Sequence, residues 1–463
     1  MKYFMAPNRF RLLVLLLAVA GDLAAAAPQS GLTLPKPLDD EIAAAIEEWQ
    51  IPGAAVVVVK DGRTVAAKGY GVRELGKPDR VDADTIFDIA SLTKSFTAAA
   101  IASMVDEGRL DWDKPIRSYL PAVQFSDPWL TANVTLRDLL CHRTGVRNNA
   151  APFRGHLTRT QVVGLFRYLE PLSAFRTKWE YSNIGYALAG EVAATAAGAS
   201  WEEVVARRII LPLDMTRTTA DFDLAPSMGN IASGHVVTNG VQRAVSRGSE
   251  RSSTAAAGAV QSSARDLATW LLFQLGDGTF KGRRVLSASS MAEMHAPQIY
   301  VPTRAEFRKS RQLEHFAAYG FGWQVWDYRG HYMLWHSGNG DGQLAYMVLL
   351  PDSNLGVAVL TNSWRTTVVL NVAMAQRILD SYLNLPTRDY VAEYRESWKK
   401  SEEKDAADEK ALEASRLKNT SPALPLLAYA GTYRDQLGLD VVVGLENEAL
   451  TFQYAGGVPA SMT

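Results

Sequence analysis

Apolar residues along the chain alternate between a helical spacing and a strand spacing, and this pattern predicts its main elements. Helical spacing, with apolar residues three or four apart, occurs at 39–50, 91–107, 136–141, 160–168, 183–198, 201–210, 265–275, 288–295 and 367–383. β-Branched segments separated by turn residues predict a hairpin over 54–71 and an antiparallel meander over 322–362. Because strands lie on both sides of the helical middle, we expect one sheet built from both ends of this region.

Three segments lack these strong patterns. The segment 220–258 is rich in Gly, Ser and Thr, and we expect it to run over the surface, where it can form the wall of a cleft. A charged helix or linker is expected over 386–421, followed by a small three-stranded β unit over 422–463 that looks truncated. The main domain is therefore expected to span 38–385.

Composition excludes several classes of protein. The chain has 463 residues, of which 47% are hydrophobic and 21% charged, and these values are typical of a globular enzyme-sized protein. Its formal net charge is −1, so nothing indicates nucleic acid as a partner. The charge balance does not identify a substrate.

The N-terminus has the pattern of a secretory signal. Basic residues at Lys2, Arg9 and Arg11 precede an apolar run over 12–20, and small residues follow at 24–27. The alternative is a membrane anchor, but the apolar run is shorter than the roughly 20 residues that a spanning helix needs. We therefore expect cleavage of residues 1–27 and a secreted or periplasmic protein with no stable membrane span.

Cys141 is the sole cysteine, so an internal disulfide is excluded. It is followed by His142, which raises the alternative of a Cys/His nucleophile. Adjacent residues rarely orient each other productively, and a small buried apolar role is favoured.

The strongest chemical signal is the pair Ser91 and Lys94. The two residues are three apart at the predicted start of the helix 91–107, so they share a face, with Ser91 expected at the N-cap. An ammonium in the first turn faces the positive end of the helix dipole among apolar neighbours, which favours a lowered pKa and a role as a base. Other Ser-x-x-Lys spacings occur in charged, solvated sequence at 397–400, 401–404 and 415–418.

Two further segments carry side chains that can handle protons or bind a substrate. Tyr181-Ser182-Asn183 precedes the helix 183–198, and its simpler interpretation is a helix cap with a packed Tyr. His336-Ser337-Gly338 is expected to close the strand 331–336, with Gly338 allowing a ligand to approach the backbone; a structural His is the alternative.

Several other chemistries lack their sequence patterns. The seven His residues show no zinc-ligand spacing, and neither a Gly-x-Ser-x-Gly elbow nor a dinucleotide fingerprint is present. The glycines at 338, 340 and 342 precede a strand, so a hairpin turn explains them better than a phosphate loop. We therefore expect no metal and no cofactor.

The order of these motifs, Ser-x-x-Lys, Tyr-x-Asn and His-x-Gly, resembles the serine β-lactamase and penicillin-binding-protein superfamily, above all its class C β-lactamase, DD-peptidase and esterase-like members. The segments 87–90, 106–111 and 139–145 agree with this resemblance. It implies an α/β fold of the α+β type, with an antiparallel sheet flanked by helices beside a helical subdomain. The tail around Tyr429 to Tyr433 resembles a small β domain often appended to such hydrolases.

The resemblance also implies roles for the residues. Ser91 would attack a carbonyl, Lys94 and Tyr181 would share the acid and base work, and Asn183 would orient the lysine and the substrate. The backbone N–H groups of Ser91 and Asn339 would form an oxyanion hole, worth about 3 kcal/mol per donor.

The third motif departs from the Lys-Thr-Gly of many relatives, because His336, Ser337 and Gly338 stand in its place. A neutral His offers no fixed charge at pH 7, which weakens the case for binding a β-lactam or a peptide carboxylate.

The sequence thus predicts an exported serine hydrolase that forms an acyl-enzyme with a small-molecule or peptide substrate. Esters and D-amino-acid peptides are favoured over β-lactams. The alternative from another class is a catalytically silent, penicillin-binding-like protein that holds cell-wall peptides, and the missing Lys of the third motif is its argument.

Overall fold

The fold is described from a computed structural model of the chain. The described residues are 34–146, 157–238, 240–247, 252–303, 315–365, 368–417, 420–434, 440–454 and 460–461. The predicted signal segment 1–27 lies outside them.

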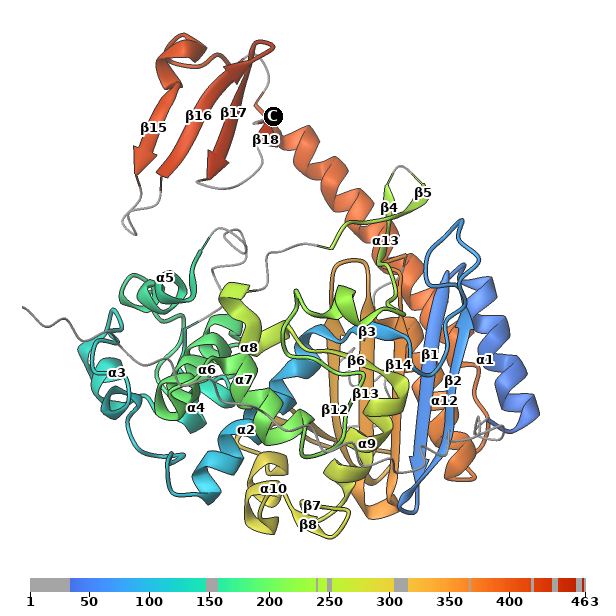
Figure 1. The fold of residues 1–463 in the computed structure, drawn as a ribbon. Helices are drawn as coiled ribbons and strands as arrows, with labels where there is room; N and C mark the ends of the chain where they lie inside the picture. Colours follow the sequence, from blue (N-terminus) through green and yellow to red (C-terminus); the bar gives the residue numbers. More distant parts are fainter. Residues whose placement is uncertain are drawn as a thin grey trace, which may run out of the picture.

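A large antiparallel sheet forms the centre of the main domain (Figure 1). Its strand order is β2-β1-β14-β13-β12-β11-β10-β9. The bounds are β1 Gly53–Lys60, β2 Arg63–Gly71, β9 Ile299–Tyr300, β10 Ala317–Tyr319, β11 Gln324–Tyr328, β12 His331–Asn339, β13 Leu344–Leu350 and β14 Leu355–Thr361. β1 pairs with β14, with Val56 opposite Val359, so the prediction of one sheet built from both ends of the domain is confirmed.

Helices cover both faces of this sheet. α1 (Lys36–Glu48) and α12 (Val369–Tyr382) lie on one face, and α9 (Ala264–Leu275) packs on the other against β1, β2 and β14 (Figure 1). Because the central strands are covered twice, β13 and β14 are buried along their whole length and read as continuous apolar runs.

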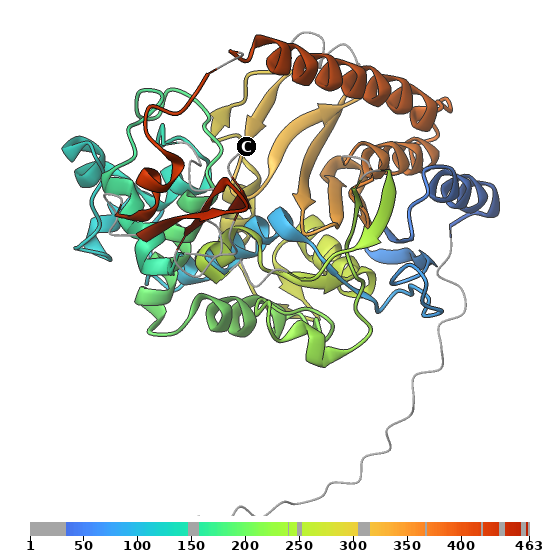
Figure 2. The same ribbon diagram turned by 90° about the horizontal axis from the view of Figure 1, so that it is seen from above.

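A helical region lies beside the sheet (Figures 1 and 2). Its helices are α2 Thr93–Asp106, α3 Pro128–Asn133, α4 Leu136–Leu140, α5 Arg159–Gly164, α6 Asn183–Ala197, α7 Trp201–Val205, α8 Ala255–Gly258 and α10 Ala288–His295. Every residue of α2 from Thr93 to Met104 is buried. Its many alanines let α6, α8 and α10 pack closely around it, so α2 is a central helix and not an amphipathic surface helix.

Short strand pairs complete the main domain. They are β3 (Ile86–Asp88) with β6 (Gln261–Ser263), β4 (His235–Thr238) with β5 (Val241–Ala244), and β7 (Thr279–Phe280) with β8 (Arg283–Arg284).

Three local predictions are wrong. Ser91 is not the N-cap of a helix, because a 3-10 turn, η1 (Ala90–Leu92), precedes α2 and Leu92 occupies the cap position. The third motif lies inside β12, which continues to Asn339 because its residues keep pairing with β13. The segment 220–258 is not all surface, since α8 is buried against α2 and α6.

The C-terminal part begins with the long helix α13 (Tyr390–Ser415), as the charged sequence predicted. Its first half packs on the main domain, where the ring of Trp398 lies 5.6 Å from that of Trp49. A separate sheet follows with strands β15 Gly431–Arg434, β16 Asp440–Glu446, β17 Ala449–Tyr454 and β18 Ala460–Ser461 (Figure 1). The fourth strand was not predicted.

Within the described ranges, no helix combines the length and the apolar character needed to cross a lipid bilayer.

Candidate active site

Ser91 sits on a strained turn between β3 and α2. Ala90, directly before it, has a φ of 45°, a left-handed conformation that costs an L-residue roughly 1–2 kcal/mol. The turn is held by Asp88, whose carboxylate accepts the Ala90 N–H at 2.8 Å. The Asp88 N–H in turn donates to Gln343 Oε1 at 3.0 Å. The position of Ser91 is therefore fixed by residues far apart in the sequence.

Lys94 is fully buried beneath Ser91. Its Nζ lies 3.1 Å from Ser91 Oγ, 2.8 Å from Asn183 Oδ1 and 2.8 Å from the Ala257 carbonyl oxygen. The two carbonyl-type oxygens can each accept one N–H of a neutral amine. The nitrogen lone pair is then directed at the Ser91 hydroxyl, which is the arrangement that a base requires.

Tyr181 reaches the same serine from the other side. Its hydroxyl donates to Ser91 Oγ at 3.1 Å. Its ring packs against the ring of His142 at 4.5 Å, and Lys94 Nζ lies 4.9 Å from its centre. Ser91 Oγ is thus within hydrogen-bond distance of both an amine and a phenol.

Both interpretations of the Tyr-Ser-Asn motif, a helix cap and a part of the site, are found at adjacent residues. Ser182 is the N-cap of α6, and its hydroxyl accepts the Gly185 N–H at 3.2 Å. Ser182 holds this capping position, and the flanking side chains of Tyr181 and Asn183 contact Ser91 and Lys94. The capping serine therefore orients its two neighbours.

His336 is buried and neutral. Its Nδ1 lies 2.7 Å from the carbonyl oxygen of Ser337, which can only accept, so Nδ1 carries the proton. Its Nε2 then accepts the hydroxyl of Tyr319 at 3.0 Å. Burial is the main cause that lowers the pKa of His336 to about 3. The imidazole is therefore uncharged at neutral pH, and both of its nitrogens contact protein groups.

Gly338 allows β12 to pass directly beside the nucleophile turn. A Cβ at this position would lie 2.2 Å from the carbonyl oxygen of Ile89, far inside a normal contact. The glycine is therefore needed for the approach of the protein's own backbone, whereas the sequence suggested the approach of a ligand. Asn339, the next residue, lines the cavity beside Ser91.

A cavity of about 310 Å³ opens at Ser91. Its lining residues are Ser91, Trp179, Tyr181, Asn183, Gln324, Trp335, His336, Ser337 and Asn339. The sequence predicted eight site residues. Six of them line this cavity: Ser91, Tyr181, Asn183, His336, Ser337 and Asn339. The other two, Lys94 and Gly338, lie directly behind it. Among the described residues, the lining holds no Lys, Arg, Asp or Glu, so this part of it is polar and aromatic without fixed charge.

Residues 38–379 match the family model described as Beta-lactamase. The chain belongs to the Beta-lactamase family. This family match and the Ser-Lys-Tyr geometry together identify a serine hydrolase-type enzyme in the broad sense.

Relatives of this Beta-lactamase family chain include proteins with hydrolase and penicillin-binding names. It is 27% identical over 427 residues to an unguisins hydrolase of Aspergillus campestris, an alignment that covers 86% of this chain and 76% of that protein. It is 28% identical over 324 residues to penicillin-binding protein 4 of Amycolatopsis lactamdurans, which covers 68% of this chain and 82% of that one.

Among solved structures, the octameric penicillin-binding protein homologue from Pyrococcus abyssi superposes with a TM-score of 0.69 at 23% identity. The match covers 92% of this chain and 89% of that one and shows the shared fold.

Sequence reasoning missed several residues of this Beta-lactamase family site. Trp179 and Trp335 form aromatic walls, and each stands one or two residues before a recognised motif, so their positions were a usable signal. Gln324, on β11, had no such signal. The Ala257 carbonyl oxygen that contacts Lys94 had none either, because a main-chain group leaves no trace in the residue types.

His142 supports Tyr181 without facing the substrate cavity. Its Nδ1 accepts the Ser182 N–H at 3.1 Å, and its burial holds its pKa well below the usual value. Cys141, next to it, is buried, and burial raises the pKa of its thiol to about 12. The thiol is therefore protonated at neutral pH, so the structure argues against the Cys/His nucleophile.

Across the described residues, no group of three or more His, Cys, Asp or Glu side chains is placed to hold a metal ion.

Proposed function

We propose that this protein is an exported serine hydrolase that cleaves an ester or amide through an acyl-enzyme on Ser91. The observation that supports this most directly is the position of Ser91 Oγ, 3.1 Å from both Lys94 Nζ and the Tyr181 hydroxyl. A nucleophile within hydrogen-bond reach of a base and a second proton donor has the parts that acyl transfer requires.

In the proposed acylation, neutral Lys94 takes the proton of the Ser91 hydroxyl while Oγ bonds to the substrate carbonyl carbon. The Ser91 and Asn339 backbone N–H groups stabilise the oxyanion. As the bond to the leaving group breaks, Tyr181 gives that group its proton and regains one from the Lys94 ammonium.

Deacylation follows the same route with water as the nucleophile. Water gives a proton to Tyr181, which passes its own proton to neutral Lys94, while the water oxygen bonds to the acyl carbon. As the bond between the acyl carbon and Ser91 Oγ breaks, the Lys94 ammonium returns the proton to Oγ. Asn183 uses its Oδ1 to hold Lys94, which leaves its amide N–H₂ to donate to a substrate carbonyl.

The lining of the cavity favours an uncharged acyl donor. Trp179 and Trp335 offer apolar faces, and His336 is neutral at the position where many relatives carry a lysine. A substrate carboxylate there would lose its hydration without gaining a cation. We therefore place esters, and D-amino-acid peptides without a free carboxylate, ahead of β-lactams. The unguisins hydrolase name of one relative supports a hydrolytic role in general.

Export rests on the signal-like sequence 1–27. Secretion of the full chain from a bacterial host, followed by N-terminal sequencing of the product, tests it. A mature N-terminus near residue 27 or 28 is expected. An uncleaved chain in the cytosol would refute export and leave the hydrolase proposal intact.

Labelling tests the hydrolase proposal. The protein is treated with a fluorophosphonate, and the adduct is mapped by mass spectrometry, with the Ser91→Ala variant as control. We expect modification at Ser91 and turnover of a short-chain nitrophenyl ester or a C-terminally amidated D-Ala-D-Ala peptide above that of a chromogenic cephalosporin. No adduct on a folded protein would refute it and favour the silent peptide-binding alternative.

A further inference from the structure

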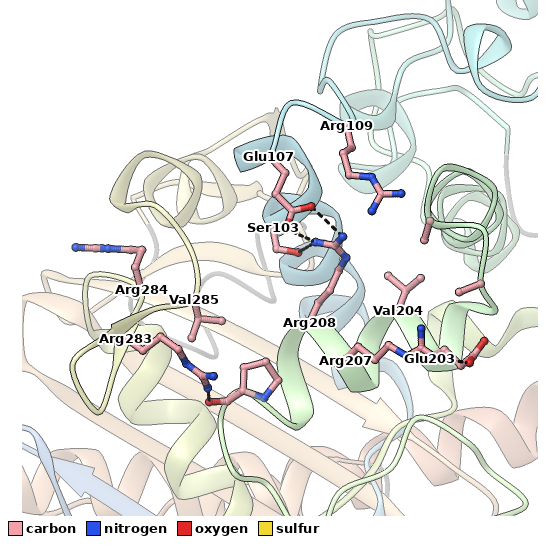
Figure 3. A pocket seen from close by; sticks show the side chains of 13 residues that line it. Ser103, Glu107, Arg109, Glu203, Val204, Arg207, Arg208, Arg283, Arg284 and Val285 are labelled. Carbon is pink, nitrogen blue, oxygen red and sulfur yellow. Dashed lines mark hydrogen bonds and ion pairs between the residues drawn. The ribbon is translucent and has the colours of Figure 1, made fainter. Parts of the chain in front are cut away.

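A second cavity, of about 440 Å³, lies at the C-terminal end of α2 (Figure 3). Ser91 lies just before the N-terminal end of the same helix. Its lining residues are Ser103, Glu107, Arg109, Ala197, Ala199, Glu203, Val204, Arg207, Arg208, Pro212, Arg283, Arg284 and Val285. It shares no residue with the cavity at Ser91. Lys94 and Glu107 are 13 positions apart, which corresponds to roughly 20 Å of helix, so the two cavities are separate.

The lining is strongly basic. Its described residues include five arginines and two glutamates and no other charged side chain. Three separate segments supply the arginines: the loop after α2, the π-helical segment Ala206–Ile210 and β8. Positive charge gathered from three segments raises the local concentration of anions.

Three of these arginines contact carboxylates. Arg208 forms a two-pronged pair with Glu107, with both N···O distances at 2.9 Å, and Figure 3 shows its side chain reaching toward Ser103 and Glu107. Arg207 pairs with Glu203 at 2.8 Å, and Arg284 pairs with Asp277 at 3.0 Å.

In the described part of the chain, Arg109 and Arg283 instead donate hydrogen bonds to neutral oxygens. Arg109 donates to the carbonyl oxygen of Ala196 at 2.6 Å, and Arg283 donates to the carbonyl oxygen of Pro212. A carbonyl accepts a hydrogen bond without cancelling a charge. Each guanidinium has five N–H donors, so these two keep both charge and donors for a ligand.

We propose that this cavity binds a small polyanion carrying at least two phosphate or carboxylate groups. The planar fork of a guanidinium matches the oxygens of either group, and such pairs are stronger than neutral hydrogen bonds. Arg109 and Arg283, which come from two segments and contact carbonyl oxygens, suit a ligand with two anionic groups better than a single ion. The side chain of Arg109 extends into the cavity on the side of the Arg208–Glu107 pair (Figure 3).

Calorimetric titration of the mature protein tests this binding. The probes are inorganic diphosphate, citrate and inorganic monophosphate at one ionic strength. We expect diphosphate or citrate to bind at least about tenfold more tightly than monophosphate. The probe that binds better distinguishes a phosphate ligand from a carboxylate ligand.

Variants locate the site. We expect binding to weaken by about tenfold or more in Arg283→Gln and in the double variant Arg109→Gln/Arg283→Gln. Arg117→Gln, at an exposed arginine outside the cavity, is the control and is expected to leave binding unchanged. Because Arg109 also holds the end of α6, Arg283→Gln provides a test that does not depend on that contact.

No binding at millimolar probe, or equal binding by the folded double variant, would overturn the proposal. Ester hydrolysis at Ser91 is measured in parallel, and its outcome is independent of this one.

Discussion

Replacing Tyr181 with Phe removes one oxygen atom and with it the 3.1 Å hydrogen bond to Ser91 Oγ. The ring stays in contact with His142 and Lys94, at 4.5 Å and 4.9 Å. A supporting hydrogen bond is worth about 0.5–1.5 kcal/mol, which corresponds to roughly a tenfold change in rate at most. Proton transfer by a positioned group is worth about 10²–10⁴. Because Tyr181 is placed for proton transfer, we expect kcat/KM to fall by at least about 100-fold.

The assay is hydrolysis of a nitrophenyl ester, with the free energy of unfolding measured in urea. Tyr186→Phe is the matched control, because its hydroxyl donates to the Leu140 carbonyl oxygen at 2.7 Å and does not contact Ser91. Its loss is expected to lower stability by about 0.5–1.5 kcal/mol with little change in kcat. A Tyr181→Phe rate within tenfold of the parent would refute the acid and base role of the phenol.

Two further predictions concern β12. Gly338→Ala places a Cβ 2.2 Å from the Ile89 carbonyl oxygen, so it is expected to displace Ser91, slow fluorophosphonate labelling and cost about 1–3 kcal/mol in urea unfolding. Gly164→Ala, where no atom lies within 4 Å of an added Cβ, is the control, and equal labelling of both variants would contradict the argument. His336 has its pKa lowered to about 3, so the unfolded chain binds more protons below pH 6.5 and the folded protein loses stability as pH falls. His336→Gln is expected to reduce that loss by up to about 1.4 kcal/mol per pH unit between pH 6 and 4, and parallel curves for the two proteins would refute the buried neutral state.

Elements set by local pattern were predicted well. The helix expected over 39–50 is α1 at Lys36–Glu48, and the run of valines after Gly53 forms β1. In these segments the spacing of apolar residues matches the face or faces that pack on the core, so the sequence pattern predicts the element.

Elements set by tertiary contact were not predicted. η1 depends on the left-handed Ala90, which is held by Asp88 and, through it, by Gln343. β12 continues through Gly338 because that residue pairs with Ala345 on β13, although the glycines there favour a turn. β6 has no strand pattern and exists through its pairing with β3. In each case the deciding partner is distant in sequence.

For the candidate site, the order of the three motifs indicated which side chains meet. Ser91, Lys94, Tyr181 and Asn183 are joined by hydrogen bonds, and their catalytic roles stay predictions. The motif could not indicate that His336 points both nitrogens at protein groups, because Tyr319 lies on another strand.

The contacts of Lys94 explain why its removal is the less informative test of the mechanism. Its amine links η1, the first residue of α6 and the carbonyl oxygen of Ala257 on α8. In Lys94→Met the buried Ala257 carbonyl and the Asn183 amide both lose this donor, and each unsatisfied group costs about 1–3 kcal/mol. Lower activity would then follow from a shifted Ser91 as readily as from a missing base. Deleting the Tyr181 hydroxyl leaves these three contacts in place, so a rate loss there reports on the chemistry itself.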